Sequence, residues 1–265
     1  MIRERHLFDL LARDIAALIA GEILAIRIRY CFSKETAQSM VNSLRDVPHR
    51  NYRYANRSGE MAMSNTQCVG MPLNELYSAL QTTDREQVIK EYLQQGKQIR
   101  QHLREACENS VLPLDALRSV LDETWPWGGH LLTLGDLRGS PGVIRLMLEK
   151  DYGDCEEPPH TDRLPPYVQE LAAQLSAIAY LQMPGSGGEL ELWPSSAENI
   201  RTLIEARNSF RDQRGPGTVI TPDVGDIVII NTGAPHAVRP FSKGVRVVQN
   251  MFIGFAGESP LLFWA

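Results

Sequence analysis

The residues best suited to chemistry in this sequence are an imidazole and a carboxylate spaced two apart, His160 and Asp162. On a β-strand, side chains two residues apart point the same way, whereas on a helix this spacing aims them at nearly opposite sides. Such a pair supplies two of the three ligands of a facial metal triad. Because His-x-Asp also arises by chance on surfaces and in caps, the interpretation depends on the rest of the chain.

A second histidine follows an apolar segment late in the sequence. Residues 227–231 are apolar, and a tight turn after them leads to His236, the natural third ligand. Arg246 lies ten residues further on, and a hairpin centred on Phe241 would place it opposite His236. A guanidinium beside a metal can hold the carboxylate of a co-substrate that also chelates the metal.

Two other histidines are weaker candidates for metal binding. His49 and His130 have no partner at a usable spacing, so we do not expect either to bind a metal. An arginine in a strand is also more often a solvated edge or an ion pair than a ligand site. The prediction of a metal site therefore rests on the combination of His160, Asp162, His236 and Arg246.

The second half of the chain has the sequence pattern of a β-sandwich. Short apolar or alternating segments separated by Gly and Pro turns predict strands over 143–149, around His160, and over 177–183, 189–193, 227–231, 245–255 and 261–264. Ser195 and Glu198 fit a capping box, which predicts a helix over 195–211, either a lid or a long connection. We therefore predict an α+β fold with a jelly-roll (double-stranded β-helix) core and helices packed mainly from the N-terminal half.

The first half reads as mainly helical. Leucine and isoleucine spacing predicts a helix over 3–20, a strand over 22–32 and a helix capped by Ser33. Residues 48–72 read as loop with short strands, and 74–123 as helices. No boundary divides the chain, so we expect one domain over 1–265: helical support and substrate-side elements to 140, and the metal-bearing core from 141.

Composition narrows the class of partner. The 265 residues are 43% hydrophobic and carry a net charge of −5, so no basic excess is available to bind nucleic acid. The four cysteines are scattered, which suits a reducing cytoplasm, and the N-terminus does not read as a signal peptide. No segment is apolar enough to span a membrane. We expect a small-molecule partner, and the sequence does not indicate the oligomeric state.

From about Arg145 to Phe255 the chain resembles the iron(II)/2-oxoglutarate-dependent oxygenases. This resemblance implies that His160, Asp162 and His236 hold Fe(II), that Arg246 binds 2-oxoglutarate, and that O2 is used to hydroxylate an unactivated C–H with release of succinate and CO2. The segments GGELELW, FIGF and LLFW look most like those of the small enzymes that hydroxylate or chlorinate free amino acids.

Departures from the family pattern refine the prediction. In the halogenases a small residue replaces the acidic ligand, so Asp162 favours hydroxylation. Val248 stands where some branches carry a serine, so a second carboxylate contact must come from elsewhere, with Tyr152 and Gln182 as candidates.

The substrate expected from the resemblance is a free amino acid or a related metabolite. Strand alternation places Val248, Asn250 and Phe252 on the interior face with Arg246, where Asn250 could bind a polar group. Glu149 could pair with an ammonium and Trp193 could wall the pocket, although ion pairing or core packing explains each residue equally well. Desaturation, cyclisation or halogenation at the same iron, hydroxylation of a peptide, and a non-catalytic metabolite-binding jelly roll remain alternatives.

Overall fold

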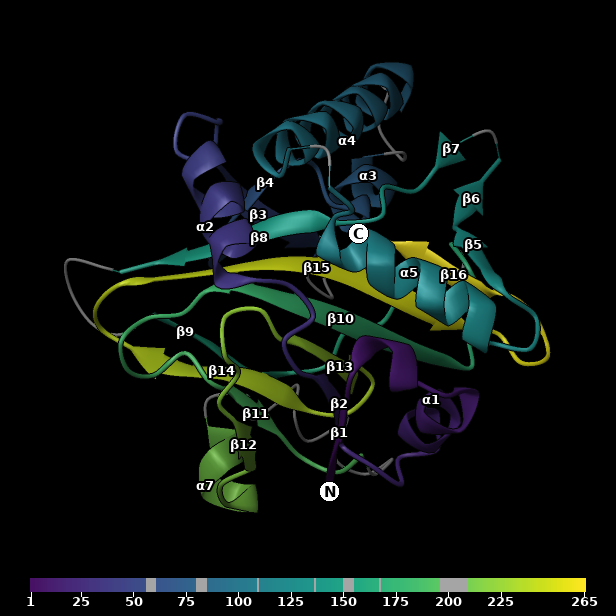
Figure 1. Ribbon diagram of the computed structural model, residues 1–265, viewed down its shortest axis with the longest axis vertical. Helices are drawn as coiled ribbons and strands as arrows, with labels where there is room; N and C mark the ends of the chain where they lie inside the picture. The colour runs from purple at the N-terminus through teal and green to yellow at the C-terminus, as the bar shows by residue number, and fades with distance from the viewer. Residues whose placement is uncertain are drawn as a thin grey trace.

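Two β-sheets that face each other form the centre of the protein, with helices on the outer side of the larger sheet (Figure 1). The computed structural model describes residues 1–55, 61–79, 85–108, 110–135, 137–149, 155–166, 168–195 and 209–265. Both sheets are largely antiparallel, so the α+β class predicted from the sequence is confirmed.

Within the described ranges, the larger sheet contains ten strands. Eight follow one path: β1 (Ile2–Arg5), β2 (Ala25–Ile28), β13 (Ile227–Asn231), β10 (Ala173–Gln182), β15 (Val245–Phe255), β8 (Val143–Leu148), β4 (Met61–Val69) and β3 (Arg50–Ala55). β16 (Leu261–Trp264) pairs with β15 and with β5 (Gly129–Leu131). A separate small hairpin joins β6 (Thr133–Leu134) to β7 (Leu137–Arg138).

The outer face of the larger sheet carries most of the apolar core. Its side chains pack against α1 (Ala12–Ile19), which follows the short helix η1 (Leu7–Asp9), and against α5 (Pro113–Thr124), α2 (Lys34–Ser43) and α4 (Arg85–Ala106). α3 (Leu73–Ala79) packs with α4 and the end of β16. Each leucine or isoleucine buried here contributes roughly 1.5–3 kcal/mol. No helix in the described ranges has the length and apolar character needed to cross a bilayer.

The smaller sheet faces the inner side of the larger one. It has the order β12 (Thr218–Ile220), β11 (Leu190–Leu192), β14 (His236–Phe241) and β9 (Cys155–His160). Its apolar side chains meet inward-pointing residues of the larger sheet in one cluster, which includes Leu190, Ile220, Ile178, Tyr180 and Val248. α7 (Phe210–Arg214) contacts the residue after β11, because Phe210 packs edge-on against Trp193.

The first predicted element is only partly a helix. Residues 2–5 form β1, which pairs in parallel with β2, and the helix starts at Ala12. Arg3 and Arg5 alternate on β1 so that both guanidiniums reach the buried carboxylate of Asp14. The prediction of a helix over 3–20 was wrong at its start, because this ion cluster favours an extended segment that apolar periodicity alone does not reveal.

Two other segments predicted from the sequence, residues 48–72 and 195–211, differ in how far the structure describes them. Residues 50–69 contain the strands β3 and β4, which extend the larger sheet beside β8, so the first half contributes more than helical support. Most of the predicted 195–211 helix, with Glu198, lies outside the described residues, and α7 begins only at Phe210. The Ser33 cap is confirmed, because its hydroxyl accepts the N–H of Thr36 at 3.1 Å.

The buried Asp14 cluster gives a prediction for acid stability. Burial alone would raise the pKa of Asp14, but hydrogen bonds from Arg5, Arg3 and the Leu11 N–H lower this pKa to about 2. A lowered pKa stabilises the fold at higher pH and stops doing so as the carboxylate gains a proton. We expect Asp14→Asn to lower the unfolding free energy at pH 7 by about 2–3 kcal/mol.

This difference between wild type and Asp14→Asn should shrink as the pH falls from about 4 towards 2, measured by urea denaturation across that range. Asp9→Asn, at an exposed position on η1, is the control and should change stability little. A difference that stays constant down to pH 2 would contradict the role given to Asp14.

Candidate metal centre

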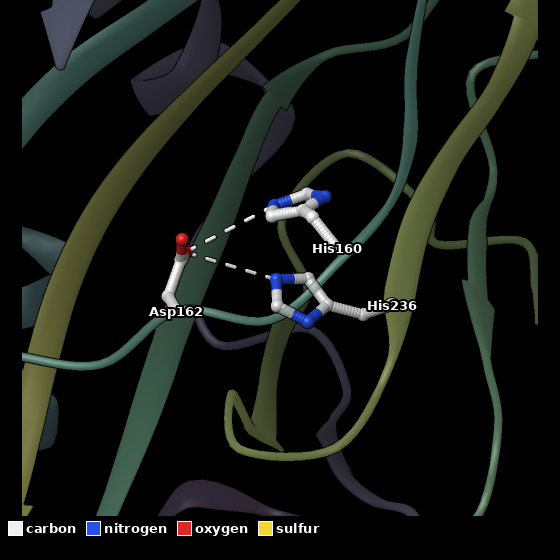
Figure 2. A group of neighbouring side chains, drawn as sticks. All are labelled: His160, Asp162 and His236. Atoms are coloured by element: carbon white, nitrogen blue, oxygen red, sulfur yellow. Dashed lines mark ion pairs between the residues drawn. The ribbon is translucent and has the colours of Figure 1, made fainter. Parts of the chain in front are cut away.

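Two imidazoles lie side by side at the end of the smaller sheet. His160 is the last residue of β9 and His236 the first of β14, and the antiparallel register pairs them directly. Their ring centroids are 4.2 Å apart, and Figure 2 shows both rings projecting to the same side. Strand pairing therefore brings together two residues that are far apart in the sequence.

Asp162 completes the group from the loop after β9. Its N–H donates to the carbonyl of Thr232 at 2.9 Å, and the Thr232 hydroxyl donates to the Asp162 carbonyl at 3.1 Å. These bonds hold the loop against the end of β13. The carboxylate Oδ2 lies 4.0 Å from Nε2 of His160 and 3.8 Å from Nε2 of His236 (Figure 2).

Backbone carbonyls set the orientation of both rings. Nδ1 of His160 lies 2.8 Å from the carbonyl oxygen of Pro158, and Nδ1 of His236 lies 3.0 Å from that of Ala234. A carbonyl can only accept, so each Nδ1–H donates and a neutral ring presents the lone pair of Nε2 towards Asp162. Metal-binding histidines are usually held in this way.

The electrostatics favour the protonation states that a metal requires. Burial lowers the pKa of His160, and the neighbouring His236 acts in the same direction. Burial would raise the pKa of Asp162, but the close His236 and His160 imidazoles and Arg145 lower it below its ordinary value. His160 is therefore biased to the neutral ring and Asp162 to the carboxylate.

One ligand atom from each of the three residues can be chosen so that all lie within 4.8 Å of one another. Two imidazole nitrogens and one carboxylate oxygen on one side of a site, with the other side open, form the donor set of mononuclear iron(II) oxygenases. The residues present therefore fit Fe(II).

A cavity of about 320 Å³ opens from the three ligands into the space between the two sheets. β15 contributes Arg246, Val248, Asn250 and Phe252, as strand alternation predicted. β8 contributes Arg145 and Met147. The cavity is therefore bordered by the triad at the end of the smaller sheet and by a row of inward-pointing side chains on the larger one.

Arg246 is almost fully buried at one end of this row. Its Nε donates to the carbonyl of Gly188 at 3.1 Å, and its guanidinium lies over the ring of Tyr180 at 5.2 Å. Gly188 has a positive φ of 74° and Gly187 one of 77°, and a side chain at Gly187 would meet the carbonyl of Pro240. Two consecutive glycines thus form the turn that holds this arginine.

Residues 149–254 match the family model described as the 2OG-Fe(II) oxygenase superfamily. The matched residues include His160, Asp162, His236 and Arg246, and members of this superfamily use Fe(II), 2-oxoglutarate and O2. A curated relative, the L-gamma-glutamyl-L-propargylglycine hydroxylase of Streptantibioticus cattleyicolor, is 22% identical over 157 residues. That match covers 58% of this chain and 59% of the relative, so the chain spans less than two thirds of the relative's length.

Solved structures of an N-substituted L-amino acid dioxygenase from Burkholderia ambifaria also resemble this protein. The complex with alpha-KG superposes with a TM-score of 0.59 and the other structure with 0.60, each at 16% identity. Each match covers 96% of this chain and 91% of the other. At this identity the likeness shows a shared fold.

Arg246 and His236 do not face each other across a hairpin, so that expectation was wrong. β14 pairs with β9 and β11 in the smaller sheet, whereas β15 pairs with β10 and β8 in the larger one. The chain crosses between the sheets at residues 242–244. Both residues still border the same cavity, from opposite sheets.

Gln182, a candidate second carboxylate contact, points away from the metal centre. The register of β10 against β15 shifts between Tyr180 and Gln182, so Tyr180 pairs with Val248 and Gln182 with Val247. This bulge turns Gln182 to the outer face, where it borders a different cavity beside α2. Tyr152, the other candidate, lies outside the described residues.

Two of the three suggested substrate contacts are not among the residues that border the cavity. Glu149 is exposed just beyond β8, and its carboxylate accepts the N–H of Gly244 at 2.7 Å. Trp193 is buried against Phe210, and its indole N–H donates to the carbonyl of Gly215 at 3.0 Å. Asn250 does border the cavity, where its Nδ2 lies 3.3 Å from the Ser176 hydroxyl.

Tyr180 and Glu157 also border or adjoin the cavity, and neither residue was predicted from the sequence. Tyr180 is fully buried beside Arg246, and within the described residues its hydroxyl has no hydrogen-bond partner. Burial raises the pKa of Tyr180, which keeps the phenol protonated as a donor. The alternation of side chains along β10 could have indicated that Tyr180 points inward. Glu157 was hidden because a surface position before Pro158-Pro159 explains a glutamate equally well.

We expect His160→Ala and His236→Ala each to weaken Mn(II) binding by about 100-fold or more, because each removes a ligand of a three-residue site. Isothermal titration calorimetry with Mn(II) measures this. His130→Ala, at an exposed histidine, is the matched control and should bind Mn(II) as the wild type does. Unchanged binding in either ligand variant would show that the metal is held elsewhere.

Proposed function

We propose that this protein is an Fe(II)- and 2-oxoglutarate-dependent dioxygenase that hydroxylates an unactivated C–H of a small polar metabolite, an amino acid or amino acid derivative. The observation that supports this most is the facing arrangement of His160, Asp162 and His236 at the end of the smaller sheet and Arg246 on the larger one, across one cavity. The match to the superfamily model over residues 149–254 supports Fe(II), 2-oxoglutarate and O2 as the cofactors that such an arrangement would use.

We also propose that the two facing sheets form a double-stranded β-helix and that residues 1–265 make one domain. The inward side chains of both sheets pack in one cluster, which supports a closed sandwich. A cytoplasmic location stays a prediction, supported by the free thiols of Cys31, Cys68 and Cys107 among the described residues.

In this proposal the three ligands hold the iron and Arg246 binds the far carboxylate of 2-oxoglutarate. Bound together, the iron, 2-oxoglutarate and O2 supply an oxidant that replaces a C–H hydrogen by hydroxyl, with release of succinate and CO2. The buried guanidinium of Arg246 can grip a carboxylate with two parallel hydrogen bonds. The Tyr180 hydroxyl, buried next to it, replaces Tyr152 and Gln182 as our choice for the second contact.

The remaining cavity residues position the substrate and limit the access of water. Ile178, Leu190 and Val248 form an apolar wall between the sheets. A cavity of about 320 Å³ suits small molecules. The relatives named for a dipeptide hydroxylase and for an amino acid dioxygenase support an amino acid derivative as the class of substrate.

The carboxylate ligand favours hydroxylation over halogenation. Asp162 occupies the third ligand position, and its backbone is fixed by two hydrogen bonds to Thr232. An added halide would need that position vacated. Desaturation or cyclisation would use the same residues, and the mass of the product separates these outcomes from hydroxylation.

A screen for succinate release tests the activity. We expect release to depend on both added Fe(II) and 2-oxoglutarate, and to rise with at least one compound in a panel of the L-amino acids, their N-acyl derivatives and simple dipeptides. Mass spectrometry of the stimulated reactions should show a product heavier by one oxygen atom. A wild-type protein that binds iron and 2-oxoglutarate but never forms succinate would refute the proposal, and a chlorinated product would overturn our use of Asp162.

Arg246→Ala should raise the apparent 2-oxoglutarate requirement by about 30-fold or more, since truncating one partner of a buried charge pair typically costs 2–5 kcal/mol of binding. Arg246→Lys should lie between Arg246→Ala and wild type, because lysine keeps the charge but loses the planar fork. Succinate formation at varied 2-oxoglutarate measures both effects. Arg239→Ala, at an exposed arginine on β14, serves as the control. An unchanged requirement in Arg246→Ala would move the carboxylate site elsewhere.

A further inference from the structure

A second guanidinium, that of Arg145, faces the cavity from the middle of β8. Its central carbon lies 4.7 Å from the ring of Tyr52 and 5.7 Å from the ring of Phe252. Cation–π contacts with two rings restrain the guanidinium, which leaves hydrogen-bond donors at its edge for a further partner. Arg145 is therefore held in place by side chains that do not neutralise its charge.

The hydrogen-bonding capacity of Arg145 is not used up by the protein. Within the described residues its Nε is buried without a partner, and its Nη2 reaches the Tyr52 hydroxyl only at 3.5 Å. Asp162 and Glu157 act on it through longer-range electrostatics. An arginine cannot lose its proton in a protein, and a buried donor without an acceptor is costly. This combination favours binding of an anion at the cavity end of Arg145.

The charged side chains around the cavity also favour binding of an anion. Among the described residues, the charged side chains that border it, apart from the histidines, are Arg145, Arg163, Arg246, Glu157 and Asp162. In the proposed complex, Fe(II) and Asp162 balance 2-oxoglutarate and Arg246. Two guanidiniums and one carboxylate then remain among the side chains around the substrate, which leaves one guanidinium side chain available to an acidic molecule.

We propose that Arg145 binds a carboxylate of the substrate, and that the Tyr52 and Phe252 rings orient its guanidinium for bidentate contact. The substrates are therefore carboxylic acids rather than amides, esters or amines without an acid group. This inference rests on the proposed function and adds the residue that selects the substrate.

The test uses the full chain loaded with Mn(II) and 2-oxoglutarate, so that binding is measured without turnover. The probes are the L-amino acids and their N-acetyl derivatives, each compared with its primary amide by isothermal titration calorimetry. We expect at least one acid to bind wild type at least tenfold more tightly than its amide. In Arg145→Gln this ratio should fall close to one.

Three further variants separate the role of Arg145 from general effects. Arg145→Lys should keep part of the preference for acids, because lysine retains the charge without the fork. Arg163→Gln removes the other unassigned arginine of the cavity and should keep most of the preference. Arg239→Gln, at an exposed position on β14, is the matched control and should behave as wild type.

Binding of Mn(II) and of 2-oxoglutarate by each variant shows that it is folded and that the cofactor site is intact. If wild type binds neither, the proposed function fails. If both bind but acids show no advantage over amides, or if Arg145→Gln keeps that advantage, only the role of Arg145 is overturned. Loss of the preference in Arg163→Gln alone would also overturn it, by giving the carboxylate to Arg163.

Discussion

The site depends above all on the pairing of β9 with β14. This antiparallel register places His160 directly opposite His236 and brings their rings within 4.2 Å of each other. Side chains alternate between the faces of a strand, so a slip of one residue would turn one imidazole away from the cavity. The inward packing of Leu190 and Leu192 on the neighbouring strand β11 opposes such a slip, because it fixes which face of the sheet is buried.

The larger sheet supports the site because its two faces carry different kinds of side chain. The outward side chains of β10 and β15 pack under α1, α2 and α5, while the inward ones border the cavity. The polar and charged residues Arg246, Asn250 and Ser176 are thereby buried on the inner face of a sheet whose outer face is apolar. A rigid, helix-covered sheet is a suitable support for such groups, because charges held in a low-dielectric site cost little to reorganise when a ligand arrives.

Features set by short-range periodicity were the ones that the sequence predicted most reliably. Alternation along β15 correctly placed Val248, Asn250 and Phe252 with Arg246, and the Ser33 cap correctly started α2. The spacing of His160 and Asp162 predicted two neighbouring side chains, which the structure does bring together, although Asp162 lies past the end of the strand.

Longer-range features escaped prediction for identifiable reasons. A short turn does not reveal whether the flanking strands pair with each other or enter different sheets, so the Phe241 hairpin was wrong. One bulge in β10 was enough to send Gln182 to the opposite face. The strand β1 was hidden because its partner for Arg3 and Arg5 is a carboxylate in the next helix.

The turn at Gly187 and Gly188 connects the two halves of the site. Its first glycine lies against Pro240 and Phe241 on the strand that begins with His236, and the carbonyl of its second glycine accepts Nε of Arg246. The turn therefore acts as a spacer between the imidazoles and the guanidinium. If Arg246 binds the far carboxylate as proposed, the chelating co-substrate would have to match that spacing, and the backbone geometry of these two glycines would then set the length of the carbon chain that fits.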